Sequence, residues 1–230
     1  MKYTCDLRIR FSEVDAEGFL KCDNFINYFQ DCSTFQSEDL GIGVDYLRKQ
    51  DLAWVVCNWQ IEIIKYPRLG DKVTVGTFSY GIKSFMGYRN YFMKDESGEY
   101  IAKASSIWVL LNTSTEKMTK VDKKQIELYG AEEKLDMNYG SRKISIPDDV
   151  EALSPIEIKS YHLDPNGHVN NGQFINIALD SSTIDKRPLG IRAEYKKQGF
   201  EGNIIIPHVN GGLVDLRNPE GESYCVVEFS

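Results

Sequence analysis

Residues 164–181, DPNGHVNNGQFINIALDS, decide the fold because they repeat residues 15–32, DAEGFLKCDNFINYFQDC. The two stretches align without a gap at an offset of 149, and six of the eighteen positions are identical. A second match, at an offset of 132, pairs residues 62–70 with residues 194–202. Self-similarity with constant spacing indicates a duplicated structural unit. The first copy then holds 17 more residues between its helix and its next strand.

Each copy has the same order of elements, a strand, a turn, a helix and then several strands. In the first copy, alternating apolar and polar residues predict a strand over 4–10 and a helix of roughly four to five turns. Long antiparallel strands are predicted over 54–66, 72–80, 85–94 and 100–111, with a turn at 95–99. The helix after Gly167 is apolar on nearly every side, which is typical of a buried helix.

A buried helix wrapped by a long antiparallel sheet is the hot-dog arrangement. The sequence therefore predicts an α+β, tandem (double) hot-dog fold. The expected units are residues 1–125 and 151–230, joined over 126–150 by a charged linker. The whole charge-rich stretch 112–150 is expected to be a surface linker that contains a short helix.

Composition excludes several classes of protein. The net charge of −7 leaves no basic field for nucleic acid. No apolar run approaches the ~20 residues that cross a bilayer, and the N-terminus lacks the apolar segment of a signal peptide. Five cysteines without a CxxC pair argue against disulfides and zinc. We expect a cytoplasmic protein without a cofactor or a metal; the oligomeric state, including a homodimer, stays open.

The stretch DPNG is a strong turn signal, and a helix beginning directly after it would leave free N–H groups near Gly167, His168 and Val169. Such donors, with the helix dipole, would stabilise an oxyanion that develops on a carbonyl group. Asp164 is expected to act as the nucleophile or as a general base. Asn166 would bind the carbonyl oxygen or the attacking water, and His168 would orient these groups or protonate the leaving group.

The first copy keeps the turn but has Glu17 and Phe19 where the second has Asn166 and His168. Only the second copy is therefore expected to be catalytic. Taken alone, DPNG is more often a plain turn, and a lone histidine is more often a packed side chain. His162, Asp164 and His168 match no zinc motif, so a metal site is disfavoured. Asn170 and Asn171 are expected to hydrogen-bond at the start of the helix and to support the site.

The string YHLDPNGHVNNGQFIN and the segment EYKKQG at 194–199 resemble the acyl-acyl carrier protein (acyl-ACP) thioesterases of plants and bacteria. The resemblance spans nearly the whole chain. It implies a double hot-dog fold, acyl-chain binding mostly by the N-terminal unit and catalysis by the C-terminal unit. It also implies active roles for Asp164, Asn166 and His168. The plant segment EYRREC ends in Glu-Cys, whereas this chain has Gln198-Gly199, so the cysteine and glutamate there are replaced. Gln198 could position water but could not act as a base.

Five basic residues fall within twelve positions of an acidic chain: Lys186, Arg187, Arg192, Lys196 and Lys197. They could bind an acidic carrier protein or the phosphate of its pantetheine arm, or they could be ordinary solvated residues. Coenzyme A also carries phosphates, so the patch does not identify the carrier. Aromatic residues of the first copy could line an acyl tunnel, although most are expected to be plain core: Phe25, Phe29, Trp54, Trp59, Phe85 and Trp108.

Three functions remain open at this stage. The first is hydrolysis of fatty acyl-ACP to free fatty acid and holo-ACP. The second is a hot-dog coenzyme A thioesterase or a dehydratase, although a dehydratase would need a histidine paired with a carboxylate. The third is a non-catalytic acyl-binding module.

Overall fold

The computed structural model describes all residues from Met1 to Ser230. The chain divides into two compact units. Unit 1 contains residues 1–20 and 28–139, and unit 2 contains residues 21–27 and 140–230. The division thus lies between Tyr139 and Gly140, inside the segment expected to be a linker. The first turn of the first long helix belongs to unit 2.

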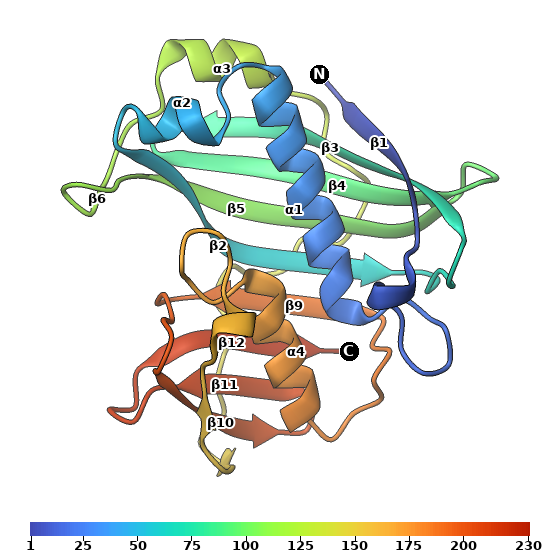
Figure 1. Ribbon diagram of the computed structural model, residues 1–230, viewed down its shortest axis with the longest axis vertical. Helices are drawn as coiled ribbons and strands as arrows, with labels where there is room; N and C mark the ends of the chain where they lie inside the picture. Colours follow the sequence, from blue (N-terminus) through green and yellow to red (C-terminus); the bar gives the residue numbers. More distant parts are fainter. The chain divides into compact units, whose positions relative to one another are not determined.

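Unit 1 is built on an antiparallel sheet with a long helix, α1, lying across its strands (Figure 1). Its elements are β1 (Tyr3–Arg8), the 3-10 helix η1 (Phe11–Glu13), α1 (Cys22–Asp39, whose first residues belong to unit 2), α2 (Val44–Arg48), β2 (Leu52–Ile63), β3 (Lys72–Lys83), β4 (Met86–Asp95), β5 (Tyr100–Asn112), β6 (Lys117–Met118) and α3 (Lys123–Tyr129). The strand order is β1-β3-β4-β5-β2, and β6 pairs with β5. The predicted strands are confirmed to within three residues at nearly every end.

Unit 2 is smaller and has the same plan, with α4 packed on β10, β11 and β12 (Figure 1). Its elements are β7 (Glu151–Ala152), β8 (Ile156–Glu157), the 3-10 helix η2 (Ser160–His162), α4 (Asn171–Ser181), β9 (Gly190–Tyr195), β10 (Ile204–Asn210), β11 (Leu213–Arg217) and β12 (Ser223–Phe229). The strand order is β9-β12-β11-β10-β7, and β8 also pairs with β10.

The two strand orders correspond, which confirms the duplication and the tandem hot-dog fold. At an offset of 132, β2 maps onto β9 and β3 onto β10. The correspondence extends to single hydrogen bonds. The N–H of Gly70 donates to the carbonyl of Ile9 at 3.0 Å, and the N–H of Gly202 donates to the carbonyl of Ile158 at 2.9 Å.

The core of each unit lies between its helix and its sheet. Most apolar residues of α4 are buried, because a helix that is apolar on most sides must be covered by other parts of the protein. The buried residues of α4 are Gly172, Phe174, Ile175, Ile177, Ala178 and Leu179. The side chains of Phe25, Phe29 and Trp59 are at most 1% exposed, which confirms the prediction that they are core. Tyr91 is also fully buried. Trp54 and Trp108 are half-buried.

The 17 extra residues of the first copy lengthen α1 and add α2. Helix α1 has 18 residues, whereas α4 has 11. Leu47 of α2 packs against Leu110 and Val121, which gives unit 1 a second apolar cluster. The insertion therefore builds additional core.

The expected linker, residues 126–150, is hydrogen-bonded to the folded units. In unit 1, the N–H of Glu132 donates to the carbonyl of Ser79 at 2.9 Å. In unit 2, the guanidinium of Arg192 donates to the carbonyl of Ser141 at 2.6 Å. Each half of the segment is thus hydrogen-bonded to its own unit, a result that charge composition alone could not show.

Candidate active site

Asp164 organises the loop that precedes α4. Its Oδ1 accepts the backbone N–H of Asn166 at 2.8 Å and that of His168 at 3.2 Å. The Asp164 N–H donates to the carbonyl of His168 at 2.7 Å, and the Gly167 N–H donates to the carbonyl of Asp164 at 3.0 Å. Gly167 has φ +78°, a conformation that glycine adopts without strain. The carboxylate therefore holds the loop closed.

The first copy has the same loop with different side chains. Oδ1 of Asp15 accepts the N–H groups of Glu17 and Phe19 at 2.9 and 3.0 Å, and Gly18 has φ +83°. The Asp15 N–H donates to the carbonyl of Phe19 at 2.8 Å. The aspartate and glycine thus form a frame common to both units, and the chemical difference lies in the residues at positions 166 and 168.

The expected oxyanion hole of backbone N–H groups at Gly167, His168 and Val169 is wrong. The first two groups donate to Asp164, and the Val169 N–H donates to the carbonyl of Gly199 at 2.9 Å. The helix also begins later than expected, at Asn171 rather than directly after Gly167. These three N–H groups are already hydrogen-bonded, so they are not free to stabilise a new negative charge.

Three side-chain groups of this loop remain available. Oδ2 of Asp164 has a single long contact, 3.4 Å from Nδ2 of Asn166. The Asn166 side chain is exposed. The ring of His168 is half-buried and lies edge-on to Phe200, with 5.0 Å between ring centroids. A carboxylate oxygen, an amide and an imidazole therefore lie on one loop, between residues 164 and 168.

Gln198 and Gly199 lie beside this loop because Gly199 is hydrogen-bonded to Val169. The backbone of Gly199 packs closely against the side chain of Val169, since a Cβ built on Gly199 would lie 2.8 Å from Cγ2 of Val169. The side chain of Gln198 is exposed. The structure thus brings Gln198 next to the loop, as the sequence predicted.

Asn170 is the N-cap of α4, as expected. Its Oδ1 accepts the N–H of Gly172 at 2.7 Å. The carbonyl of Asn171 accepts the hydroxyl of Tyr195 at 3.0 Å, which ties the helix start to β9. The role of Tyr195 was not predicted, since nothing in its sequence position signals that contact.

Asn170→Ala is expected to lower the free energy of unfolding by about 1 kcal/mol, because alanine cannot satisfy the Gly172 N–H. Asn170→Ser is the control, since a serine hydroxyl caps a helix nearly as well. Urea unfolding of the three proteins measures the effect. Equal stability of Asn170→Ala and wild type would contradict the capping role.

His162 is a second residue that the sequence did not reveal as part of this frame. It is 8% exposed, and its Nδ1 accepts the N–H of Lys159 at 3.0 Å. In unit 1, Glu13 accepts the N–H of Arg10 at the corresponding place. Burial lowers the pKa of His162 below its ordinary value. Extending the alignment of the two copies by two residues toward the N-terminus pairs Glu13 with His162, and this pairing could have identified the position.

The depressed pKa makes stability depend on pH. The unfolded chain binds the His162 proton at about pH 6.5, before the folded chain does. Stability should therefore fall as pH drops below about 6.5, with a slope of at most about 1.4 kcal/mol per pH unit. His162→Gln keeps an acceptor for Lys159 and does not titrate, so the gap between the two proteins should close toward low pH. A constant gap between pH 8 and pH 5 in urea unfolding would contradict this.

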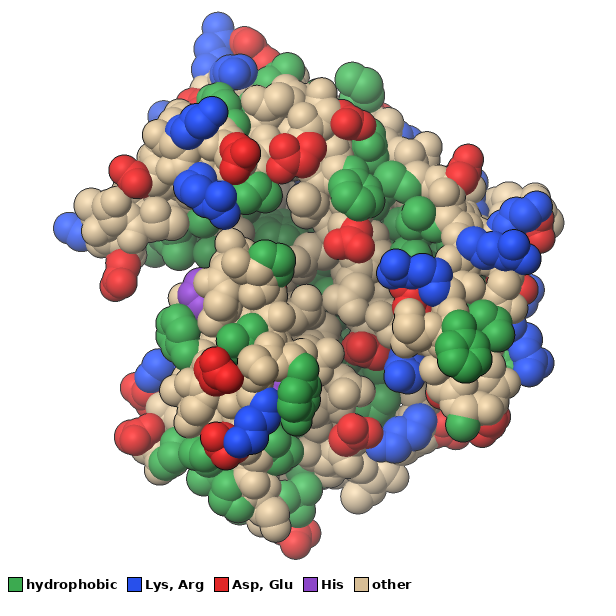
Figure 2. Space-filling model, viewed as in Figure 1, with side chains coloured by type: hydrophobic (Ala, Val, Ile, Leu, Met, Phe, Trp, Pro, Cys, Tyr) green, Lys and Arg blue, Asp and Glu red, His purple; other side chains and the backbone are tan.

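The five basic residues do not form one free patch. Lys186 pairs with Asp180 at 3.0 Å, Arg192 pairs with Glu228 and Lys197 pairs with Glu222, each at 2.5 Å. On the face in Figure 2, basic side chains are interspersed with acidic ones. A strong positive field is therefore not supported, and Lys196 is an exposed member of the group that has no ion pair.

Four of the five cysteines offer no activated thiol. None of the five forms a disulfide, and burial raises the pKa of Cys5, Cys22, Cys32 and Cys225. The thiolate is the nucleophilic form, so raised pKa values make these groups inert. No group of three His, Cys, Asp or Glu side chains is arranged to bind a metal. No helix is long and apolar enough to span a bilayer.

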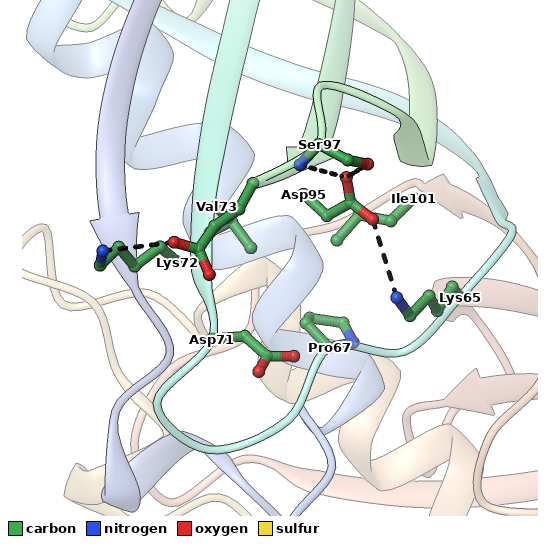
Figure 3. A pocket seen from close by; sticks show the side chains of 9 residues that line it. Lys65, Pro67, Asp71, Lys72, Val73, Asp95, Ser97 and Ile101 are labelled. Carbon is green, nitrogen blue, oxygen red and sulfur yellow. Dashed lines mark hydrogen bonds and ion pairs between the residues drawn. The ribbon is translucent and has the colours of Figure 1, made fainter.

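A surface pocket of about 190 Å³ lies in unit 1, lined by nine residues (Figure 3). Lys65 points toward Asp95 at 3.7 Å, and Asp95 is also hydrogen-bonded to Ser97. Lys72 pairs with Glu96 at 3.2 Å. This lining carries two lysines and three carboxylates, so the pocket does not suit an acyl chain.

Comparisons with known proteins agree with the fold. Residues 1–129 match the family described as acyl-ACP thioesterase N-terminal domain. A chloroplastic acyl-[acyl-carrier-protein] hydrolase of Cuphea viscosissima is 28% identical over 94% of this chain and 55% of its own length. The chloroplastic palmitoyl-acyl carrier protein thioesterase of Arabidopsis thaliana is 30% identical over 82% of this chain and 48% of its own length. This chain spans about half the length of these curated relatives.

Among solved structures, an acyl-ACP thioesterase from Bacteroides thetaiotaomicron superposes with a TM-score of 0.89 and 22% identity. The match covers 99% of this chain and 96% of that one. It confirms the tandem hot-dog fold over both units.

Proposed function

Because the chain belongs to the acyl-ACP thioesterase family, we propose that it hydrolyses the thioester of fatty acyl-ACP to free fatty acid and holo-ACP. The observation that carries this proposal is the comparison of the two loops. Both have the same hydrogen-bonded frame, but the second adds Asn166 and His168. Unit 2 is accordingly the catalytic unit, and unit 1 binds the acyl chain.

Asp164 supplies the base in this proposal. Its Oδ1 is spent on two backbone N–H groups, so Oδ2 is the oxygen that takes a proton from the attacking water. The water oxygen adds to the thioester carbon, and the carbon–sulfur bond then breaks. Alternatively Oδ2 attacks the carbon itself. Incorporation of labelled water oxygen into Asp164 in a single turnover would identify the second route.

Asn166 and His168 supply the remaining chemistry. With the backbone N–H groups spent, the Asn166 amide is the donor to the developing oxyanion. His168 gives a proton to the leaving thiolate, since its ring lies on the same loop and has no hydrogen-bond partner in the protein. Gln198 is exposed beside the loop and positions water. It cannot be charged, which leaves Asp164 as the base.

The carrier protein binds to the basic side chains near β9 in this proposal. Lys196 is exposed, and the pairs of Lys186 and Lys197 are at the surface, where ion pairs contribute little and exchange readily. An acidic carrier protein could thus replace their partners. Five free cysteines are compatible with a cytoplasmic setting.

Release of free thiol from matched acyl-ACP and acyl-coenzyme A substrates tests the proposal. We expect turnover of acyl-ACP, with a higher kcat/KM than for the coenzyme A thioester of the same chain. Higher kcat/KM for the coenzyme A substrate would reassign the carrier. A chain that binds acyl groups and hydrolyses neither substrate would be a non-catalytic binding module.

A further inference from the structure

The interior of unit 1 contains a row of polar side chains between its helix and its sheet. Strand pairing aligns Ser79 of β3 with Arg89 of β4, Arg89 with Ser106 of β5, and Ser106 with Trp59 of β2. Paired residues of neighbouring strands point to the same face. That face is the one covered by α1, because Arg89 contacts Gln36 and Trp59 stacks on Phe29. We call these four residues the polar belt.

Two atoms of the belt have no hydrogen-bond partner. They are Nε1 of Trp59 and Oγ of Ser79, in side chains that are 1% and 2% exposed. Buried polar atoms are nearly always paired, because an unpaired one loses its bonds to water and gains nothing. Two such atoms in one row are therefore unusual for a purely structural core.

The belt also contains a buried cation without a carboxylate. Arg89 is 8% exposed, and its guanidinium donates to the neutral oxygens of Gln36 and Thr77 and lies 5.1 Å from the ring of Tyr129. Buried charges are normally paired with an opposite charge. A core built only for stability would place apolar residues here.

Trp59 is surrounded by other aromatic rings. Its ring centroid lies 4.7 Å from that of Tyr91, 6.2 Å from that of Phe29 and 6.4 Å from that of Trp108. The Trp108 indole N–H donates to Ser106 at 2.6 Å, so its donor is satisfied, while that of Trp59 is not. An unsatisfied donor inside an aromatic cage suits a ligand that is apolar along its length and carries one oxygen.

We propose that the polar belt is a specificity element for acyl chains that carry a hydroxyl or oxo oxygen, with the Trp59 indole N–H as its donor. The proposal rests on acyl-chain binding by unit 1, as proposed above. A saturated chain would leave the Trp59 donor unpaired, whereas an oxygenated chain accepts its hydrogen bond. Selection for the oxygenated chain follows from that difference.

The kinetic test compares kcat/KM for saturated and hydroxyacyl-ACP of equal length, with the hydroxyl placed at successive carbons. For one hydroxyl position we expect Trp59→Phe to reduce the ratio of hydroxyacyl to saturated kcat/KM by about five- to tenfold, as for one lost hydrogen bond. Trp54→Phe is the matched control. It removes an indole N–H that is already bound to Gln125 at 3.2 Å, so the ratio should not change. An unchanged ratio in Trp59→Phe at every position would overturn the proposal.

A second measurement needs neither turnover nor a stable Trp59 variant. The chain has three tryptophans, so its indole N–H groups give three resonances, assigned by Trp54→Phe and Trp108→Phe. We expect a free hydroxy fatty acid to shift the Trp59 resonance downfield, and a saturated acid of equal length not to do so. Identical shifts with both acids would contradict the belt's role. A chain that hydrolyses no thioester but shows the selective shift would refute the proposed function alone.

Discussion

Asp164→Asn is expected to lower kcat by about 10²–10⁴ while leaving the protein folded. The amide oxygen of asparagine can still accept the N–H groups of Asn166 and His168, so the loop keeps its frame. The substitution removes the negative charge and the basic oxygen. A fall in kcat of about 10²–10⁴ is the usual effect of losing a general base. Thiol release from acyl-ACP measures kcat, and urea unfolding checks that stability is retained.

Asp15→Asn is the matched control for that prediction. Asp15 accepts the N–H groups of Glu17 and Phe19 in the same geometry. If the aspartate acts only through the frame, neither variant should lose activity, because asparagine keeps the frame of both loops. We expect Asp15→Asn to keep a near wild-type kcat. A wild-type rate in Asp164→Asn would remove Asp164 from the mechanism.

Replacing both Asn166 and His168 by their counterparts from the first copy should abolish hydrolysis. The variant Asn166→Glu with His168→Phe leaves the frame intact, because Asp164 binds the backbone and not these side chains at Oδ1. It removes the proposed oxyanion donor and the proposed acid, so we expect kcat to fall by about 10³ or more. The two losses need not multiply, since residues that act on one transition state are not additive.

The reverse exchange in unit 1, Glu17→Asn with Phe19→His, is the control for this double variant. It makes the same kinds of change at the corresponding positions of the other loop. Its kcat should stay close to that of the wild type. A comparable loss in both double variants would mean that the exchange disturbs the fold and not the chemistry.

Much of the fold could be predicted because the repeat is carried by local signals. The turn ending in Gly167 and Gly18, and the helix after each, depend on backbone conformation, which particular residue types impose. Apolar and polar residues alternate clearly along the long strands of unit 1, so the sequence predicts the bounds of these strands to within a few residues. The residue-level match then placed the chemical difference at positions 166 and 168.

The errors concern partners that are distant in sequence or hidden by geometry. The Val169 N–H meets Gly199 thirty residues away, so no local pattern showed that it was spent. Arg192 of β9 pairs with Glu228 of β12, and Lys197 pairs with Glu222 just outside the same two strands. Charge counted along the sequence could not detect that neutralisation. The unpaired Trp59 donor was likewise invisible, because it depends on what surrounds one buried atom.

The claim that the second loop hydrolyses acyl-ACP is tested most directly by a single-turnover reaction with the protein in excess over acyl-ACP. We expect the wild-type chain to release one free thiol and one free fatty acid per acyl-ACP, and the chain with Asn166→Glu and His168→Phe to leave the acyl-ACP intact. Intact acyl-ACP with the wild-type chain, or release at the wild-type rate by the double variant, would contradict it.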